Sequence, residues 1–260
     1  MKEEFSLKIN IETSNITGSN IMKWLDKAPF FEVVSFQADD IKKYKNPTNW
    51  EIVNLNEVFM DIEKISYPIF LTFKDDYNNS LLLGMHENYS FLLFNIYDLQ
   101  GADLQHWIKY TNSFFEINNI GVVACFYPED DLFWQKNVDP GQYKLYGKSL
   151  DGLTLRPFNK VSSLIDVSSL PGYPNEFDNL WFGSTWKMIY GEKYFQFLSR
   201  EKLLSYSNAY EVEQLNNQAI SITLFENHKN YSTDKARYIQ KEFRNYMEID
   251  QIVDVLEKTR

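Results

Sequence analysis

Residues 69–97 read IFLTFKDDYNNSLLLGMHENYSFLLFNIY, and this stretch decides the class of fold. It contains three strand-like runs: Ile69–Phe73, Leu81–Met85 and Phe91–Tyr97. Asp75–Asn79 is rich in residues that favour turns and separates the first two runs. Phe91–Phe94 is apolar on both faces, which is typical of a central strand. Successive strands of this kind indicate mixed or antiparallel sheets.

The residues before this stretch predict two strands and two helices. Phe5–Ile11 alternates with period two, as a half-buried strand does. Thr17 is placed to cap a short helix that Pro29 ends, and Phe30–Phe36 then forms a second strand. Asn54 begins a second helix, whose apolar residues make one continuous stripe.

The residues after this stretch complete a first unit. Asp103 caps a third helix, and Ile120–Phe126 forms a further buried strand. We therefore expect an acidic α+β unit over residues 1–127, with the element order β-α-β-α-β-β-β-α-β.

Residues 128–180 have a different composition. Proline, glycine, aspartate and serine are frequent there, and the hydrophobic periodicity is weak. We interpret this segment as an irregular connector. It is predicted to contain short strands near Tyr143–Tyr146 and Leu153–Leu155 and a helical turn at Leu132–Lys136.

Periodicity returns in a C-terminal α+β unit, residues 181–260. Gly191-Glu192 suits a type II′ turn between the strands Trp186–Tyr190 and Tyr194–Leu198. A short helix, a second hairpin over Tyr210–Leu224 and two terminal helices follow. The predicted fold class is α+β, with mixed or antiparallel sheets, helices packed on one face and a C-terminal hairpin-helix-hairpin-helix unit. The same pattern also fits one continuous domain.

The chain is acidic, with a net charge of −10 that is unevenly spread. Residues 1–150 hold 21 acidic and 13 basic side chains, whereas residues 151–260 hold 15 and 13. A nucleic-acid binder needs a cationic face, and no strong basic cluster occurs, so we expect no nucleic-acid partner. An acidic half attracts a basic protein partner. The charge also fits the simpler role of keeping an aromatic-rich chain in solution.

Cysteine usage and the N-terminus indicate the compartment. Cys125 is the single cysteine, which excludes intrachain disulfides and a zinc site built from several cysteines. The N-terminus lacks the pattern of a signal peptide, and no apolar run approaches the roughly 18 residues of a membrane span. We therefore expect a cytoplasmic protein without a membrane partner. These features leave the oligomeric state open.

Sequence motifs for catalysis are absent. No G-x-G-x-x-G, G-x-x-x-x-G-K-[ST] or G-x-S-x-G motif occurs. Cys125 lies in an apolar run, where cysteine is typically a small core residue. His86, His106 and His228 lack metal-binding spacing, and a structural role fits each of them better. We predict no catalytic residue, no cofactor and no metal site.

Carboxylates cluster in three predicted loops. From these clusters, and from the aromatic residue that follows the last of them, we predict the partner-binding residues Asp39, Asp40, Asp75, Asp76, Glu129, Asp130, Asp131 and Trp134. Acidic loops can steer and bind a cationic protein surface, and an aromatic side chain can anchor it. The same aspartates also fit ordinary turn chemistry.

Three segments of the last third carry a resemblance to known proteins. They are Trp181–Trp186 (WFGSTW), Glu201–Ser205 (EKLLS) and Gln240–Tyr246 (QKEFRNY). In element order and aromatic usage, residues 181–246 resemble uncharacterised bacterial proteins of the polymorphic-toxin immunity type. The resemblance implies a cytoplasmic α+β protein that works by binding, and it carries over no functional residue.

Three functional hypotheses follow, of which the third is a structural or assembly component of a mobile element, which should show a large apolar patch or a symmetric contact. The first is a non-enzymatic binding protein, an immunity-like inhibitor that neutralises a basic bacterial toxin through acidic loops. The alternative is a hydrolase or transferase whose site is assembled from loop carboxylates and a histidine. A deep pocket that holds His86 or His106 beside an aspartate pair would favour the enzyme. A flat acidic face would favour the inhibitor.

Overall fold

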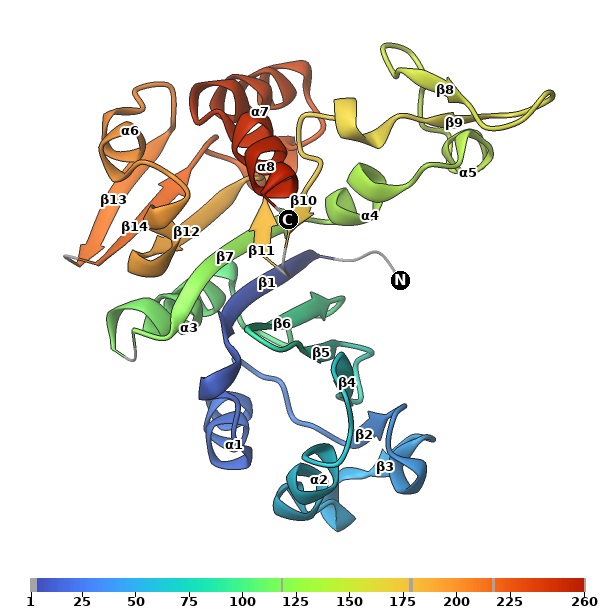
Figure 1. Cartoon of the computed structure of the whole chain (residues 1–260), viewed down its shortest axis with the longest axis vertical. Coiled ribbons are helices and arrows are strands. Elements are labelled where there is room, and N and C mark those ends of the chain that lie inside the picture. Colours follow the sequence, from blue (N-terminus) through green and yellow to red (C-terminus); the bar gives the residue numbers. More distant parts are fainter. Residues whose placement is uncertain (1–3, 118, 178–179, 217, 260) are drawn as a thin grey trace.

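One antiparallel sheet of ten strands runs through the protein (Figure 1). The structure is a computed structural model that describes residues 4–117, 119–177, 180–216 and 218–259. Across the sheet the strands are β13 (Glu211–Asn216), β14 (Ala219–Thr223), β12 (Lys187–Gly191), β7 (Gly121–Pro128), β1 (Phe5–Glu12), β6 (Tyr89–Ile96), β5 (Ser80–Met85), β4 (Ile69–Lys74), β2 (Ser35–Ala38) and β3 (Thr48–Asn49). Two small hairpins pair β8 (Leu155–Pro157) with β9 (Ser163–Ile165) and β10 (Asn175–Phe177) with β11 (Leu180–Phe182).

Helices connect these strands. The α-helices of the described residues are α1 (Gly18–Lys27), α2 (Leu55–Ile62), α3 (Leu104–Glu116), α4 (Asp131–Lys136), α5 (Pro140–Leu145), α6 (Arg200–Ser205), α7 (Asp234–Tyr246) and α8 (Ile249–Lys258). The 3-10 turns are η1 (Thr13–Asn15), η2 (Lys42–Tyr44), η3 (Trp50–Ile52), η4 (Val167–Ser169), η5 (Glu192–Gln196) and η6 (His228–Asn230).

The N-terminal strand β1 lies in the middle of the sheet, between β6 and β7. Leu7 pairs with Phe94 on one side and Phe126 on the other, so these three side chains share one face. Helix α3 covers that face, because its Trp107 ring lies 5.1 Å from the Phe94 ring and 5.6 Å from the Phe5 ring. The aromatic residues of the chain thus form the centre of the main core.

The β10–β11 hairpin covers the opposite face of the sheet centre. The Trp181 indole donates a hydrogen bond to the Tyr127 hydroxyl of β7. The Tyr194 hydroxyl, in turn, donates to the Trp181 carbonyl at 2.6 Å. The middle of the sheet is therefore buried on both faces, which explains why seven successive residues of β1 are buried.

Capping residues set the helix starts that the sequence predicts. The Thr17 hydroxyl accepts a hydrogen bond from the Asn20 amide at 3.2 Å, and the Asn54 side chain accepts from the Asn56 amide at 3.1 Å. Asp103 forms a capping box with residue 106 at the start of α3. Short polar side chains satisfy the free amides of a first helical turn, so these three predictions are confirmed.

The structure differs from the sequence prediction after β12. Tyr194–Leu198 was expected to return as a strand, but Glu192–Gln196 forms the 3-10 turn η5. Gly191 has a φ of −85°, whereas a type II′ turn needs a positive φ there. This glycine is required for close strand packing, because a Cβ would overlap the carbonyl oxygen of Gly121 in the neighbouring strand.

Two other predicted strands are also wrong. Tyr143–Tyr146 belongs to helix α5 and its C-terminal cap, because Asp139 caps the helix and Pro140 occupies its first turn. The strand predicted over Phe30–Phe36 is displaced, since β2 begins at Ser35 and Phe30 has a φ of 52°. The signals for helix α5 were present in the sequence, but they lay in a segment interpreted as irregular.

The α+β class with antiparallel sheets and several helices is confirmed. The Tyr210–Leu224 hairpin is also confirmed as β13 and β14, and Leu132–Lys136 is helical as predicted. The main sheet takes strands from the predicted units 1–127 and 181–260. The segment between them supplies α4, α5 and three of the short strands, β8, β9 and β10.

Candidate partner-binding site

Loops at one end of the main sheet carry a row of carboxylates. Glu4 precedes β1, Asp98 follows β6 and Glu129 follows β7. The first residue of β1 pairs with the last residues of both neighbouring strands, so all three loops leave the sheet at the same end. The backbone joins them directly, because the Glu129 amide donates to the Glu4 carbonyl at 2.9 Å.

Two further loops reach the same end of the sheet. Asn79, in the β4–β5 turn, donates to the Asp98 carbonyl at 2.8 Å and so fixes this turn beside the loop after β6. Glu226 follows β14, and the charges of Glu4 and Glu129 act on the nearby His228. We define the acidic edge as Glu4, Asp76, Asp98, Glu129, Asp130 and Glu226. Lys74 and Lys229 also lie at this end, and Lys148 Nζ lies 3.8 Å from Asp130 Oδ2, so the carboxylates outnumber the lysines.

Asp39 and Asp40 lie at the other end of the sheet. The pairing of β2 with β4 places Ala38 opposite Leu71, so the chain runs toward the start of β4 after Ala38. An Asp40 carboxylate oxygen accepts from the Phe70 amide at 3.4 Å. Both aspartates are exposed, but the length of β4 separates them from the acidic edge.

Asp75 is buried within its own turn. Its Oδ1 accepts from the amides of Tyr77 at 2.8 Å and Asn79 at 2.9 Å, and its Oδ2 accepts from the Asn79 side chain at 2.8 Å. Burial raises the pKa of the Asp75 carboxyl, and these hydrogen bonds oppose the rise. Asp75 therefore shapes the turn, while the adjacent Asp76 is the exposed carboxylate.

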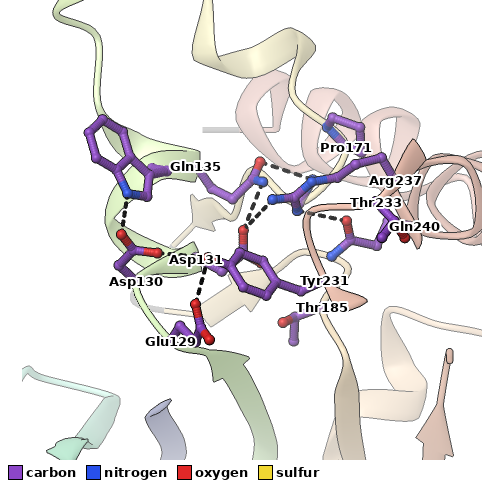
Figure 2. A network of polar contacts seen from close by, with 12 residues as sticks. Glu129, Asp130, Asp131, Gln135, Pro171, Thr185, Tyr231, Thr233, Arg237 and Gln240 are labelled. Atoms are coloured by element: carbon purple, nitrogen blue, oxygen red, sulfur yellow. Dashed lines mark hydrogen bonds and ion pairs between the residues drawn. The ribbon is translucent and has the colours of Figure 1, made fainter. Parts of the chain in front are cut away.

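Asp131 and Trp134, the two predicted residues in α4, are buried. Asp131 Oδ1 accepts hydrogen bonds from Arg237 Nη2 at 2.7 Å and from Gln135 Nε2 at 3.1 Å (Figure 2). Arg237 Nη1 also donates to Gln240 Oε1 at 2.9 Å. This network ties the start of α4 to α7 and pairs the charge of Asp131 with Arg237 through Oδ1, whereas Oδ2 is buried without a hydrogen-bond partner among the described residues.

Glu129 and Asp130 lie between this network and the solvent. The Tyr231 hydroxyl donates to Asp130 Oδ1 at 2.8 Å and lies 3.2 Å from Glu129 Oε2 (Figure 2). The Trp134 indole donates to the second oxygen of Asp130. Burial opposes ionisation, but the hydrogen bonds from Trp134 and Tyr231 hold the pKa of Asp130 below its ordinary value. Asp130 is therefore ionised at neutral pH.

Strands β4, β5 and β6 leave one of their faces half-exposed, and buried and half-exposed residues alternate along them. We call this surface the open face; its side chains are Phe70, Thr72, Leu82, Phe91 and Leu93. The solvated face of an antiparallel sheet is usually polar, whereas apolar side chains on it are typical of a contact surface. The Phe91–Phe94 run thus forms a central strand, as predicted, but only Leu92 and Phe94 are fully buried.

A projecting segment borders the open face. We call residues 140–165, from the start of α5 to the end of β9, the arm, and Figure 1 shows it extending away from the sheet. At its base, a groove of about 500 Å³ lies between Asn95 of β6, Tyr97 just after that strand, and Phe133 of α4. Phe133 is 51% exposed. Asn95 shares the face of Leu93, so the groove continues the open face towards the acidic edge.

Lys8 lies in a stack of aromatic rings at the border of the open face. Its Nζ lies 3.3 Å from the centre of the Trp181 ring and 4.2 Å from that of the Phe91 ring. The Phe91 ring in turn covers Gly84, where a Cβ would overlap it. Burial lowers the pKa of Lys8 to about 7, although the charge of Glu176 opposes the shift. Sequence reasoning missed Lys8, since it is one of the polar positions of a normally alternating strand.

Replacing Lys8 by methionine is expected to change how stability depends on pH. The folded-state pKa of about 7 lies below the ordinary value of 10.5, so between these values the folded state binds fewer protons than the unfolded state. The free energy of unfolding of the wild type therefore rises as the pH increases through this window. At about pH 6 we expect Lys8→Met to be more stable by on the order of 2 kcal/mol, the burial cost of the charge less its cation–π contacts.

Urea unfolding of both proteins at about pH 6 and about pH 9 measures this effect, and the stability difference should shrink at the higher pH. Lys64→Met, at an exposed lysine, is the control and should show no such convergence. If the difference in free energy of unfolding between Lys8→Met and the wild type were the same at both pH values, burial would not disfavour the charge of Lys8.

A second groove contains one of the three histidines. It has a volume of about 810 Å³, lies between α1 and α3, and is lined in part by His106. His106 Nδ1 is 2.8 Å from Asp103 Oδ1, and the same pair forms the capping box of α3. The carboxylate beside His106 is thus its helix cap, while Asp39-Asp40 follow β2 and Asp75-Asp76 follow β4.

Comparisons with known proteins identify no family. No protein-family model matches the chain, and no curated protein matches it. Among solved structures, a Pseudomonas aeruginosa T6SS protein superposes with a TM-score of 0.49 and 8% identity, over 98% of this chain and 88% of that one. We take no function from this match. In the described part of the chain, no group of three or more His, Cys, Asp or Glu residues could hold a metal ion.

None of the helices within residues 4–117, 119–177, 180–216 and 218–259 is both long and apolar enough to cross a bilayer.

Proposed function

We propose that this chain is a non-enzymatic binding protein, an immunity-like inhibitor that neutralises a basic bacterial toxin in the cytoplasm. The observation that carries the proposal is that five loops place six carboxylates along one end of the sheet, the acidic edge, next to the apolar open face. The proposal assigns the partner's cationic groups to the acidic edge and its apolar side chains to the open face and the groove.

The chemistry of this surface supports a protein as the occupant. The half-exposed aromatic and aliphatic side chains would form the apolar centre of an interface, from which the partner excludes water. Phe133 provides an aromatic anchor at the groove. Carboxylates at the rim accelerate the encounter with a cationic partner and discriminate against anionic ones. Nucleic acid would be repelled by the same charges.

The placement of the predicted residues refines the proposal. Asp76, Glu129 and Asp130 belong to the proposed site, while Asp75, Asp131 and Trp134 support it from inside the fold. Asp39 and Asp40 lie at the far end of the sheet and provide a matched control.

The test is to identify the proteins encoded by the adjacent genes and to measure the binding of this chain to any basic, toxin-like protein among them. We expect the double variant Asp76→Lys/Asp98→Lys to raise the dissociation constant by roughly tenfold or more and to slow association. The control Asp39→Lys/Asp40→Lys makes the same change of charge and should stay within about threefold of the wild type. Surface plasmon resonance at low and high salt measures both rates.

If both variants weakened binding equally, the net charge of the chain would explain the effect, and the acidic edge would not be a defined binding site. Tight binding that neither variant nor salt alters would contradict the acidic edge as the contact surface.

A further inference from the structure

The arm differs from the rest of the protein in how it is held. Its Tyr143 and Ile165 form a small cluster with Trp134 that is separate from the main core. Beyond this cluster, all residues from 154 to 163 are exposed. A two-stranded hairpin is marginally stable alone, so an arm of this form gains stability when another surface covers it.

The arm exposes apolar side chains along its length. Five of its large hydrophobic side chains are exposed, two of them by 80% or more: Leu145 (80%), Tyr146 (68%), Leu155 (49%), Phe158 (67%) and Val161 (94%). Exposed apolar side chains that are concentrated in one projecting segment are typical of an interaction surface.

The arm also has the opposite charge to the rest of the chain. Residues 140–165 contain four basic side chains, Lys144, Lys148, Arg156 and Lys160, and the single acidic residue Asp151, a net charge of +3. The whole chain has a net charge of −10, which leaves −13 on the remaining residues. Lys148 Nζ already lies 3.8 Å from Asp130 Oδ2 of its own chain. The acidic edge also complements the remaining cations of the arm in charge.

We propose that the arm docks on the acidic edge and open face of a second copy of this chain, and that the protein forms a two-fold symmetric dimer. Arg156 and Lys160 then face carboxylates of the partner's acidic edge. Phe158 and Val161 cover apolar side chains of the partner's open face. Each copy contributes one arm and one acidic edge, so two equal contacts form.

The position of the arm permits this arrangement. The chain passes from Asp130 of the acidic edge through α4 directly into the arm. Because the arm begins beside the surface that it complements, one two-fold axis can bring each arm over the other copy's acidic edge. Such an isologous contact closes on itself and stops at the dimer.

The inference does not require the toxin of the proposed function, but it uses the same surface. A basic partner that binds the acidic edge would compete with the arm, so the two contacts exclude each other. Separate variants can test them, because the arm carries the cations and the acidic edge carries the carboxylates.

The experiment is light scattering and sedimentation of the full chain over a wide concentration range. We expect the wild type to reach twice its 30.8 kDa mass at high concentration. Val161→Asp and Arg156→Glu/Lys160→Glu should raise the dimer dissociation constant by roughly tenfold or more. Val255→Asp, at a 60% exposed valine of α8, is the matched control and should dimerise like the wild type.

A charge-swap measurement identifies the docking surface. Two double variants are compared: Arg156→Glu/Lys160→Glu in the arm and Asp76→Lys/Asp98→Lys in the acidic edge. Each variant alone should dimerise more weakly than the wild type, and an equimolar mixture of the two should recover part of the association. This result stands whether or not a toxin binds, so the failure of one proposal is distinguishable from that of the other.

Three outcomes would overturn the inference. One is a monomeric wild type at every concentration. Another is a dimer that the arm variants leave intact. The third is a monomer whose arm binds vesicles of phosphatidylserine and phosphatidylcholine, which would assign the arm to anionic lipid instead.

Discussion

Replacing Arg237 by methionine is expected to lower the free energy of unfolding by about 3–5 kcal/mol. Asp131 is 0% exposed, and Arg237 Nη2 lies 2.7 Å from its Oδ1. Without the guanidinium, Gln135 alone donates to this buried oxygen, and a carboxylate without a counter-charge in the interior is strongly destabilising. Urea unfolding followed by tryptophan fluorescence measures the loss.

Two controls separate the buried charge from the change in shape. The double variant Asp131→Leu/Arg237→Met removes both charges and should recover most of the lost stability. Lys64→Met breaks the exposed pair with Asp61 and should cost less than about 1 kcal/mol. If Arg237→Met also cost under about 1 kcal/mol, solvent would be reaching Asp131 and the network would not be the tie between α4 and α7.

The second large effect is expected for Phe94→Ala, at about 3–5 kcal/mol. Phe94 is 0% exposed, and its ring contacts those of Phe31 at 5.8 Å, Trp107 at 5.1 Å and Tyr110 at 5.8 Å. The truncation removes apolar burial and leaves a cavity that this aromatic packing can fill only in part. Denaturant unfolding gives the value, and an unchanged m-value would show that the fold persists.

The control for Phe94→Ala is Tyr238→Ala, at a tyrosine of α7 that is 64% exposed. A substitution at this exposed position should change stability by no more than about 0.5 kcal/mol. Similar losses for the two variants would contradict the central place of Phe94 in the core.

Local signals account for the part of the fold that the sequence predicts. Alternation in Phe5–Ile11, the turn at Asp75–Asn79 and the caps Thr17 and Asp103 act within a few residues of each other, so a single sequence reveals them. The pairing of β1 with both β6 and β7 is set by contacts across more than 80 positions, such as Leu7 with Phe94. No local pattern carries that information.

The candidate site, like the fold, could be predicted from the sequence only in part. The acidic loops are visible in the sequence as clusters, but whether two of them lie at the same end of the sheet depends on strand order. The strand order separates Asp39-Asp40 from the acidic edge. It also brings Glu4, Asp98 and Glu226 to that edge. The sequence also does not reveal which aspartates are exposed, because Asp75 and Asp131 have the sequence context of surface turn residues. The apolar positions Phe91 and Leu93 signalled a central strand, while their half-exposed side of the sheet became evident only from the tertiary structure.

The central place of β1 has a consequence for synthesis on the ribosome. This strand, Phe5–Glu12, is translated before both of its partners, which end at residues 96 and 128. Until those residues emerge, the nascent chain carries an apolar strand without its neighbours, the kind of segment that chaperones bind. The two halves of the sheet therefore join late, and a chain that stalls before Gly121 lacks the strand that links β1 to β12.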